Sequence, residues 1–88
     1  MPQGNNAKII FYATKWCPDC LRAKRIMERE AVEFQEINID GNQEAAAMVR
    51  QLNNGNRSVP TIVFPDGTQL TEPSSSELRQ KLRSLQPW

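Results

Sequence analysis

Apolar residues follow two different spacings along the chain, and the changes between them predict alternating strands and helices. The run Lys8–Ala13 is apolar after its first residue and rich in strand formers, which is typical of a strand buried on both faces of a sheet. From Pro18 to about Glu30, apolar residues recur at helical spacing instead. This pattern predicts an amphipathic helix whose buried face carries Cys20, Ala23, Met27 and Ala31.

A second strand and a second helix follow. The segment Val32–Ile39 alternates between apolar and polar residues, apart from one slip at its centre, and predicts a strand. Strand, helix and strand in this order imply a right-handed parallel crossover. A turn then leads into a predicted helix over residues 43–52, for which Asp40 paired with Gln43, or Asn42 alone, are the candidate caps.

The last third of the chain predicts a hairpin and a third helix. Residues 53–56 are three asparagines and a glycine, a composition typical of a left-handed helix end. Residues 62–64 and 69–71 are predicted strands, and the tight Pro-Asp-Gly-Thr turn between them indicates an antiparallel hairpin. A capping box of Ser74 and Glu77 opens the last helix. Its apolar stripe consists of Leu78, Leu82 and Leu85.

The predicted order is therefore β-α-β-α-β-β-α, and we expect one α/β domain over residues 1–88. A net charge of +1 counts against nucleic acid or an anionic membrane as the main partner. No apolar run is long enough to span a membrane and no secretory signal is present, so a cytoplasmic protein is expected. Basic residues nevertheless cluster on the first helix, as a solvated face or a docking surface for an acidic partner: Arg22, Lys24, Arg25 and Arg29.

The only two cysteines, Cys17 and Cys20, lie at the predicted start of the first helix. Pro18 between them suits a first helical turn, where its missing N–H is tolerated. With Cys17 as the N-cap, the unpaired amides and the helix dipole favour its thiolate, the form that attacks disulfides. Thiol pKa values in such pairs fall from about 8.5 to roughly 3.5–7.5. Cys20 is one turn deeper, where it can resolve a mixed disulfide formed on Cys17.

Three other interpretations of the cysteine pair compete with redox chemistry. A structural disulfide that closes so short a loop stabilises little. Zinc normally takes four ligands, and this chain has no histidine and no further cysteine, so a zinc site needs a dimer. Two unrelated buried thiols are the third possibility. The strand before the pair and the helix after it favour the redox interpretation.

The motif Trp16-Cys17-Pro18-Asp19-Cys20, the Val59-Pro60-Thr61 segment and the order of elements together resemble the glutaredoxin branch of the thioredoxin fold. The resemblance covers residues 8–85, and the segments 54–61, 64–68 and 70–74 look most like mycoredoxins. It implies a four-stranded mixed sheet flanked by three helices. It also implies a thiol-disulfide oxidoreductase that reduces protein mixed disulfides with a low-molecular-weight thiol, mycothiol or a similar one, and holds no tightly bound cofactor.

The resemblance further implies which residues surround the bound thiol. Pro60 is expected to be a cis proline beside the cysteine pair, with the Val59 backbone pairing to the ligand. Arg57 is expected near a carboxylate or polar group of the thiol. Lys15 is a further candidate for binding the thiol, and it stands one place later than the lysine that many glutaredoxins use. Trp16 is either an apolar surface that shields the Cys17 sulfur or a core residue. Glutathione-dependent glutaredoxins often have an aromatic residue before the second cysteine and a Gly-Gly-x-Asp motif after the hairpin. This chain has Asp19 and Glu72-Pro73-Ser74 instead, which counts against glutathione as the native thiol.

Asp19 and the choice of electron donor remain open at this point. A carboxylate between the two sulfurs disfavours the Cys17 thiolate by like-charge repulsion, so we expect Asp19→Gly to lower the Cys17 pKa. One alternative function is a dithiol donor recharged by a thioredoxin reductase, of the type that serves ribonucleotide reductase. Another is an iron-sulfur cluster held by two chains, which Pro18 disfavours. We expect a monomer whose partners are a small thiol and disulfide-containing proteins.

Overall fold

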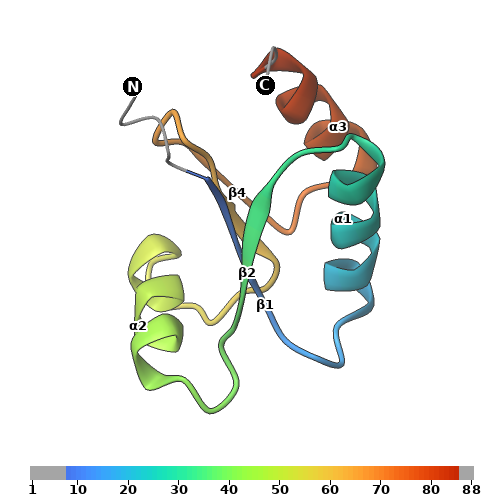
Figure 1. Ribbon diagram of the computed structural model, residues 1–88. Coiled ribbons are helices and arrows are strands. Elements are labelled where there is room, and N and C mark those ends of the chain that lie inside the picture. Colours follow the sequence, from blue (N-terminus) through green and yellow to red (C-terminus); the bar gives the residue numbers. More distant parts are fainter. Residues whose placement is uncertain (1–7, 86–88) are drawn as a thin grey trace.

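The computed structural model describes residues 8–85 and contains four strands and three helices in the predicted order (Figure 1). The elements are β1 (Ile9–Ala13), α1 (Pro18–Arg29), β2 (Phe34–Asn38), α2 (Gln43–Leu52), β3 (Thr61–Val63), β4 (Gln69–Thr71) and α3 (Ser75–Ser84).

The strands form one mixed sheet in the order β2-β1-β3-β4. β1 runs parallel to β2 and antiparallel to β3, and β3 and β4 form the predicted antiparallel hairpin. Helices α1 and α3 pack together on one face of the sheet, while α2 covers the other face (Figure 1). The fold is the thioredoxin-like arrangement that the resemblance implied, with β1 leading directly into the cysteine pair.

Two apolar clusters lie on the two faces of the sheet. The larger one packs α1 and α3 onto the sheet, with Phe11, Met27 and Leu78 at its centre, each no more than 1% exposed. The smaller cluster fixes α2 through Ala46 and Val49. β1 is fully buried on the face toward α1 and α3 but only half-buried on the face toward α2, whereas the apolar run predicted burial on both faces. The packed strand supports, at its carboxyl end, the loop that carries Cys17.

The end of α1 differs from the prediction. Ala31 is exposed and lies beyond the helix at φ 58°, and Ile26 is buried in the face for which Ala31 was predicted. The N–H of Ala31 donates to Glu28 O at 3.1 Å and that of Val32 to Met27 O at 3.2 Å, the hydrogen-bond pattern of a Schellman motif. The helix stops here although alanine replaces the usual glycine at the left-handed position.

The second strand, β2, is shorter than predicted and lies at the edge of the sheet. Val32 and Ile39, the predicted ends of the strand, are buried in the loops on either side of it. The position of β2 at the edge accounts for the exposed Gln35 and Glu36. Asn42 alone caps α2, accepting the N–H of Ala45 at 3.0 Å. The other helix start follows its prediction, since Ser74 and Glu77 form a complete capping box on α3.

Candidate active site

Cys17 is the N-cap of α1 and carries the geometry that its place in the sequence predicts. Its backbone is extended, Pro18 is the first helical residue, and its Sγ accepts the N–H of Cys20 at 3.1 Å. Its carbonyl already accepts the N–H of Leu21 at 3.0 Å, which begins the helix. An amide that donates to sulfur stabilises a thiolate more than a thiol, and the positive end of the helix adds to this effect.

Cys17 and Cys20 form a disulfide in this structure, with their Cα atoms 5.1 Å apart. The two residues differ in access to solvent. Cys20 is 3% exposed and packs in the larger core cluster, whereas Cys17 is half-buried at the tip of the helix. An incoming disulfide therefore reaches Cys17 first, and Cys20 is sheltered behind it.

The Val59–Pro60 peptide bond is cis, as the resemblance implied. Thr61, the next residue, pairs with Tyr12 across the β1–β3 ladder, so Val59 and Pro60 lie at the end of the sheet where β1 leads to Cys17. Val59 is half-buried and Pro60 is buried. The pairing of β1 with β3 thus brings two segments that are about 40 residues apart in the chain to the same end of the sheet.

A partly buried polar network supports the segment around Pro60, and sequence reasoning missed it. Asn53 at the end of α2 donates to Thr61 Oγ1 at 3.0 Å and to Val49 O at 2.8 Å, and it accepts from Thr71 Oγ1 at 2.7 Å. Thr61, fully buried, donates in turn to Ser58 O at 2.8 Å. The only signal in the sequence is the polarity of Thr61, directly before the apolar residues predicted as a strand.

Trp16 does not belong to the core, because the residue is 85% exposed. The Nζ atom of Lys15 lies 5.4 Å from the centre of the Trp16 ring, at the distance of a cation–π contact. Both side chains thus lie on the surface immediately before Cys17. Together they present an exposed aromatic ring with a positive charge beside it, directly before Cys17 in the chain.

Arg57 is held by a charge that the sequence did not predict. Its Nη2 lies 2.6 Å from Oδ1 of Asp40, an ion pair that joins the loop before α2 to the loop after it. The two loops border a hollow of about 580 Å³ at the start of α2, lined by Arg57, Arg50 and Gln43 among others. Because Asp40 already pairs with Arg57, a carboxylate on a ligand has to compete for this guanidinium.

A smaller hollow of about 240 Å³ reaches Cys20 from the side of β2. It lies between α1, β2 and the loop before Cys17, and an ion pair of 2.9 Å between Lys24 Nζ and Glu36 Oε1 lines it. The hydrogen bond to Glu36, with the negative charge of that group, raises the pKa of Lys24 above its ordinary value of 10.5. The cationic Lys24 is therefore engaged with Glu36 at neutral pH.

Two absences concern the part of the chain that the structure describes. Residues 8–85 contain no group of three or more histidine, cysteine, aspartate or glutamate side chains placed to hold a metal ion. None of the helices in this range has the length and apolar character needed to cross a membrane.

Comparisons with known proteins place the chain in a family. Residues 9–69 match the sequence model of the family described as Glutaredoxin. The chain is 42% identical over 76 residues to a Mycobacterium tuberculosis (strain H37Rv) protein named as a glutaredoxin, covering 86% of this chain and 90% of that one. It therefore belongs to the glutaredoxin family and is a thiol-disulfide oxidoreductase.

One further sequence relative and one solved structure are similar to the chain over most of its length. Mycoredoxin 1 of Corynebacterium glutamicum is 35% identical over 79 residues, which are 90% of this chain and 98% of the relative. The structure of NrdH-redoxin from Escherichia coli superimposes with a TM-score of 0.74 at 27% identity, covering 93% of this chain and 99% of that one. The resemblance to the glutaredoxin family, and within it to mycoredoxins, is thus confirmed.

Proposed function

We propose that this protein reduces protein mixed disulfides with a low-molecular-weight thiol, with Cys17 as the nucleophile and Cys20 as the resolving thiol. The observation that carries the proposal is the position of Cys17 Sγ as the N-cap of α1, 3.1 Å from the N–H of Cys20. A sulfur that accepts this amide at the positive end of a helix is stabilised as a thiolate. Its half-exposed position leaves it open to attack a disulfide.

In the reduced protein, the Cys17 thiolate attacks the small-thiol sulfur of a protein mixed disulfide. A new disulfide forms between Cys17 and the small thiol, and the substrate protein leaves as a thiolate that takes up a proton. A second small thiol, as its thiolate, then attacks the small-thiol sulfur bound to Cys17. The Cys17 thiolate is regenerated and the two small thiols leave as their own disulfide, so two electrons pass from them to the substrate.

Cys20 offers a second exit from the mixed disulfide. Its thiolate attacks Cys17, the small thiol leaves in reduced form, and the Cys17–Cys20 disulfide closes. This disulfide is the bond that the structure contains. Because Cys20 is adjacent to Cys17, its attack competes with that of the second small thiol. Turnover does not require Cys20, since the second small thiol can also complete the cycle.

We propose mycothiol as the small thiol. The similarity to Mycoredoxin 1 supports this choice, as does Glu72-Pro73-Ser74 in place of the Gly-Gly-x-Asp motif of glutathione-dependent relatives. The pairing of Arg57 with Asp40 also favours a ligand that brings polar groups rather than a free carboxylate to this position. Lys15, Trp16 and the Val59-Pro60 backbone complete the proposed binding surface.

The test is an assay of mixed-disulfide reduction with mycothiol, bacillithiol and glutathione as alternative reductants, using the wild type, Cys17→Ser and Cys20→Ser. We expect the highest kcat/KM with mycothiol, no activity in Cys17→Ser, and retained activity in Cys20→Ser. Turnover by Cys17→Ser contradicts the assignment of the nucleophile. A preference for glutathione contradicts the assignment of the thiol and leaves the nucleophile standing.

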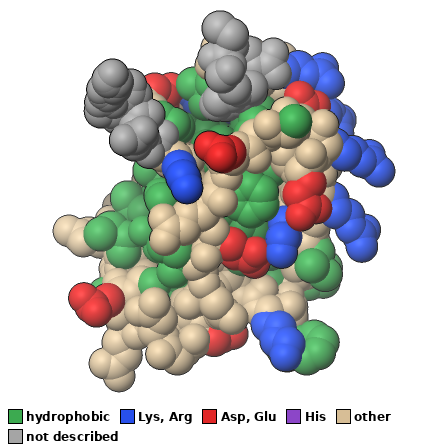
Figure 2. All heavy atoms as spheres, in the orientation of Figure 1, with side chains coloured by type: hydrophobic (Ala, Val, Ile, Leu, Met, Phe, Trp, Pro, Cys, Tyr) green, Lys and Arg blue, Asp and Glu red, His purple; other side chains and the backbone are tan. Residues whose placement is uncertain are grey.

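A dithiol donor recharged by a thioredoxin reductase is the second candidate. The likeness to NrdH-redoxin favours it, since that protein is described as having a thioredoxin-like activity profile. Basic side chains gather along the edge formed by α1 and α3 (Figure 2), a surface suited to an acidic reductase. Regeneration by purified reductase and NADPH, abolished in Cys20→Ser, identifies this route, whereas the mycothiol route survives that substitution.

We further infer a cytoplasmic monomer of one domain. A lone pair of reactive cysteines is typical of a reducing compartment. The large apolar side chains that lie exposed among residues 8–85 are Trp16 in the loop before α1, Leu21 on α1 and Met48 on α2. Gel filtration with light scattering tests the monomer.

A further inference from the structure

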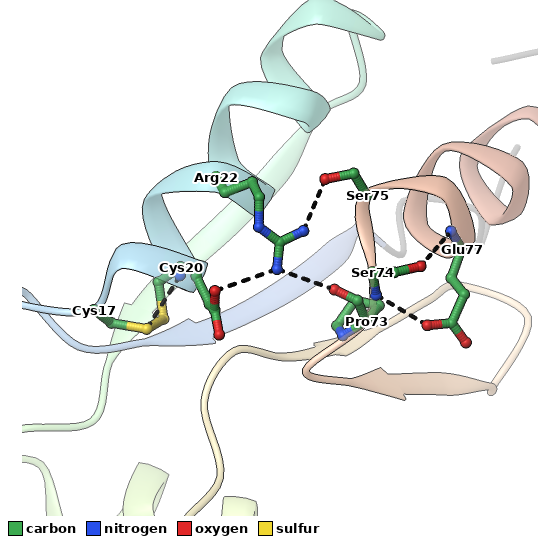
Figure 3. Close-up of polar contacts among 8 residues, drawn as sticks. Cys17, Cys20, Arg22, Pro73, Ser74, Ser75 and Glu77 are labelled. Carbon is green, nitrogen blue, oxygen red and sulfur yellow. Dashed lines mark hydrogen bonds and ion pairs between the residues drawn. A yellow bond between two sulfur atoms is a disulfide. The ribbon is translucent and has the colours of Figure 1, made fainter.

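Arg22 joins the first turn of α1 to the start of α3 (Figure 3). Its Nη1 donates to Ser75 Oγ at 2.9 Å, and its Nη2 donates to the carbonyl oxygen of Pro73 at 3.3 Å. The same Nη2 lies 3.4 Å from Oδ1 of Asp19. One guanidinium therefore connects a carboxylate from within the cysteine pair to two groups that are more than 50 residues away in the chain.

This arrangement changes what the sequence implies about Asp19. In the sequence, Asp19 is a free negative charge that opposes the Cys17 thiolate. In the structure, the guanidinium of Arg22 lies within hydrogen-bond distance of the Asp19 carboxylate and compensates its charge. Pro73 and Ser75 hold the other side of the guanidinium, so the position of Arg22 does not depend on Asp19 alone.

We propose that Arg22 is a positioning residue that sets the acidity of the Cys17 thiol, because it holds the Asp19 carboxylate away from the sulfur and compensates its charge. This inference deepens the proposed function, since it concerns the nucleophile assigned there. Released from Arg22, the Asp19 carboxylate is free to turn toward the unpaired amides of the first turn of α1. There it competes with the sulfur for the same positive end of the helix.

Other charged groups near the cysteine pair come from the loop after β1, from α1, from β2 and from α3. Lys15, Lys24 and Glu36 line the hollow that reaches Cys20, and Lys24 is paired with Glu36. On α3, Glu77 accepts the N–H of Ser74. None of them is changed in the variants proposed below, so their contribution is the same in every protein compared. Asp19 and Arg22 are both partly exposed, and solvent screening keeps the expected effect modest.

The experiment measures the ionisation constant of Cys17 from the pH dependence of its alkylation by iodoacetamide. All proteins carry Cys20→Ser, so a single thiol reports. The variants are Asp19→Asn, Arg22→Met and the two combined. Arg25→Met is the matched control, since Arg25 is an exposed arginine one turn further along α1. The mycothiol assay and the melting temperature are recorded for each protein.

We expect Arg22→Met to lower the ionisation constant of Cys17 about threefold when Asp19 is present. The same substitution is expected to lower it less than about twofold when Asn replaces Asp19, because only the distant charge of Arg22 is then lost. Arg25→Met is expected to leave the constant unchanged. This non-additive pattern separates a positioning role from a simple sum of charges.

Two results overturn the proposal. One is an ionisation constant in Arg22→Met equal to that of Arg25→Met, even if the melting temperature falls, which identifies a purely structural residue. The other is full additivity of the Asp19 and Arg22 substitutions. Where Arg22→Met does not fold, Ser75→Ala replaces it, because it removes one hydrogen bond and no charge, and an unchanged constant there overturns the proposal too.

Failure of the proposed function gives a different result. If Cys17 is not the nucleophile, the Cys20→Ser protein itself titrates near the ordinary thiol value of about 8.5 and lacks mixed-disulfide reductase activity. In that outcome, substitutions at Arg22 say nothing about catalysis, and the failure is assigned to the proposed function and not to the role of Arg22.

Discussion

Asn53 Nδ2 donates a hydrogen bond of 3.0 Å to Oγ1 of Thr61, the residue that directly follows the cis Val59–Pro60 bond. The end of α2 is thereby tied to the segment at the cysteine-bearing end of the sheet. Removal of the amide takes the donor away from the fully buried Thr61 Oγ1 and the acceptor away from the Thr71 hydroxyl, while Thr61 keeps its bond to Ser58 O.

We therefore expect Asn53→Ala to lower the free energy of unfolding by about 1–3 kcal/mol in urea titrations. Asn56→Ala is the matched control, because Asn56 is exposed in the same loop, and it is expected to change the free energy by less than about 0.5 kcal/mol. Equal losses in the two variants contradict a specific role for the Asn53 network.

A substitution at Ala31 is expected to stabilise the protein, in contrast to Asn53→Ala. The φ of 58° at Ala31 lies in the left-handed region, where an L side chain is strained and glycine is not. Ala31→Gly is therefore expected to raise the free energy of unfolding by about 0.5–1 kcal/mol, after the greater entropy of glycine in the unfolded chain is subtracted.

The control for Ala31 is the same substitution within a helix. Ala47 is exposed within α2, and Ala47→Gly is expected to lower the free energy of unfolding by about 1 kcal/mol. Thermal and urea unfolding of the two variants check the pair. A loss of stability in both shows that the backbone at Ala31 is not strained.

The ion pair between Asp66 and Lys81 is expected to make the stability of the protein depend on pH. A hydrogen bond from Lys81 at 2.8 Å, with further bonds from Thr68, holds the pKa of Asp66 well below its ordinary value of 3.8. A carboxyl group whose folded pKa is lowered stabilises the fold above its unfolded pKa and loses this contribution as the pH falls toward the folded pKa.

We expect the difference in free energy of unfolding between the wild type and Asp66→Asn to be constant above about pH 5. The difference is expected to shrink steadily below about pH 4. Lys81→Met removes the partner and is expected to show the same trend. Urea titrations at pH 7, 4, 3 and 2 measure it, and a difference that grows in acid contradicts the assigned ion pair.

Features set by neighbouring residues could be predicted from the sequence. The N-cap at Cys17 with Pro18, the capping box of Ser74 and Glu77, and the order of the seven elements all depend on local patterns, and the structure contains them. Ala31 was misplaced because helical spacing of apolar residues continues past the end of α1, where no glycine marks the stop.

Contacts between distant segments could not be predicted in the same way. Arg57 and Asp40 are 17 residues apart, and Arg22 reaches Ser75 across 53 residues. From the sequence alone, a charged side chain in a loop or on a helix is predicted to be solvated, because its partner lies in a distant segment that only the fold brings close. For this reason the sequence indicated the two cysteines, whereas the residues that hold Arg57 and Asp19 in place emerged only from the structure.

The most direct test of the account is the pH dependence of iodoacetamide alkylation at Cys17 in the reduced Cys20→Ser protein. If Cys17 is the nucleophile at the positive end of α1, half-maximal reactivity falls at or below about pH 7.5. A midpoint near 8.5, with the reactivity of a free cysteine, contradicts it.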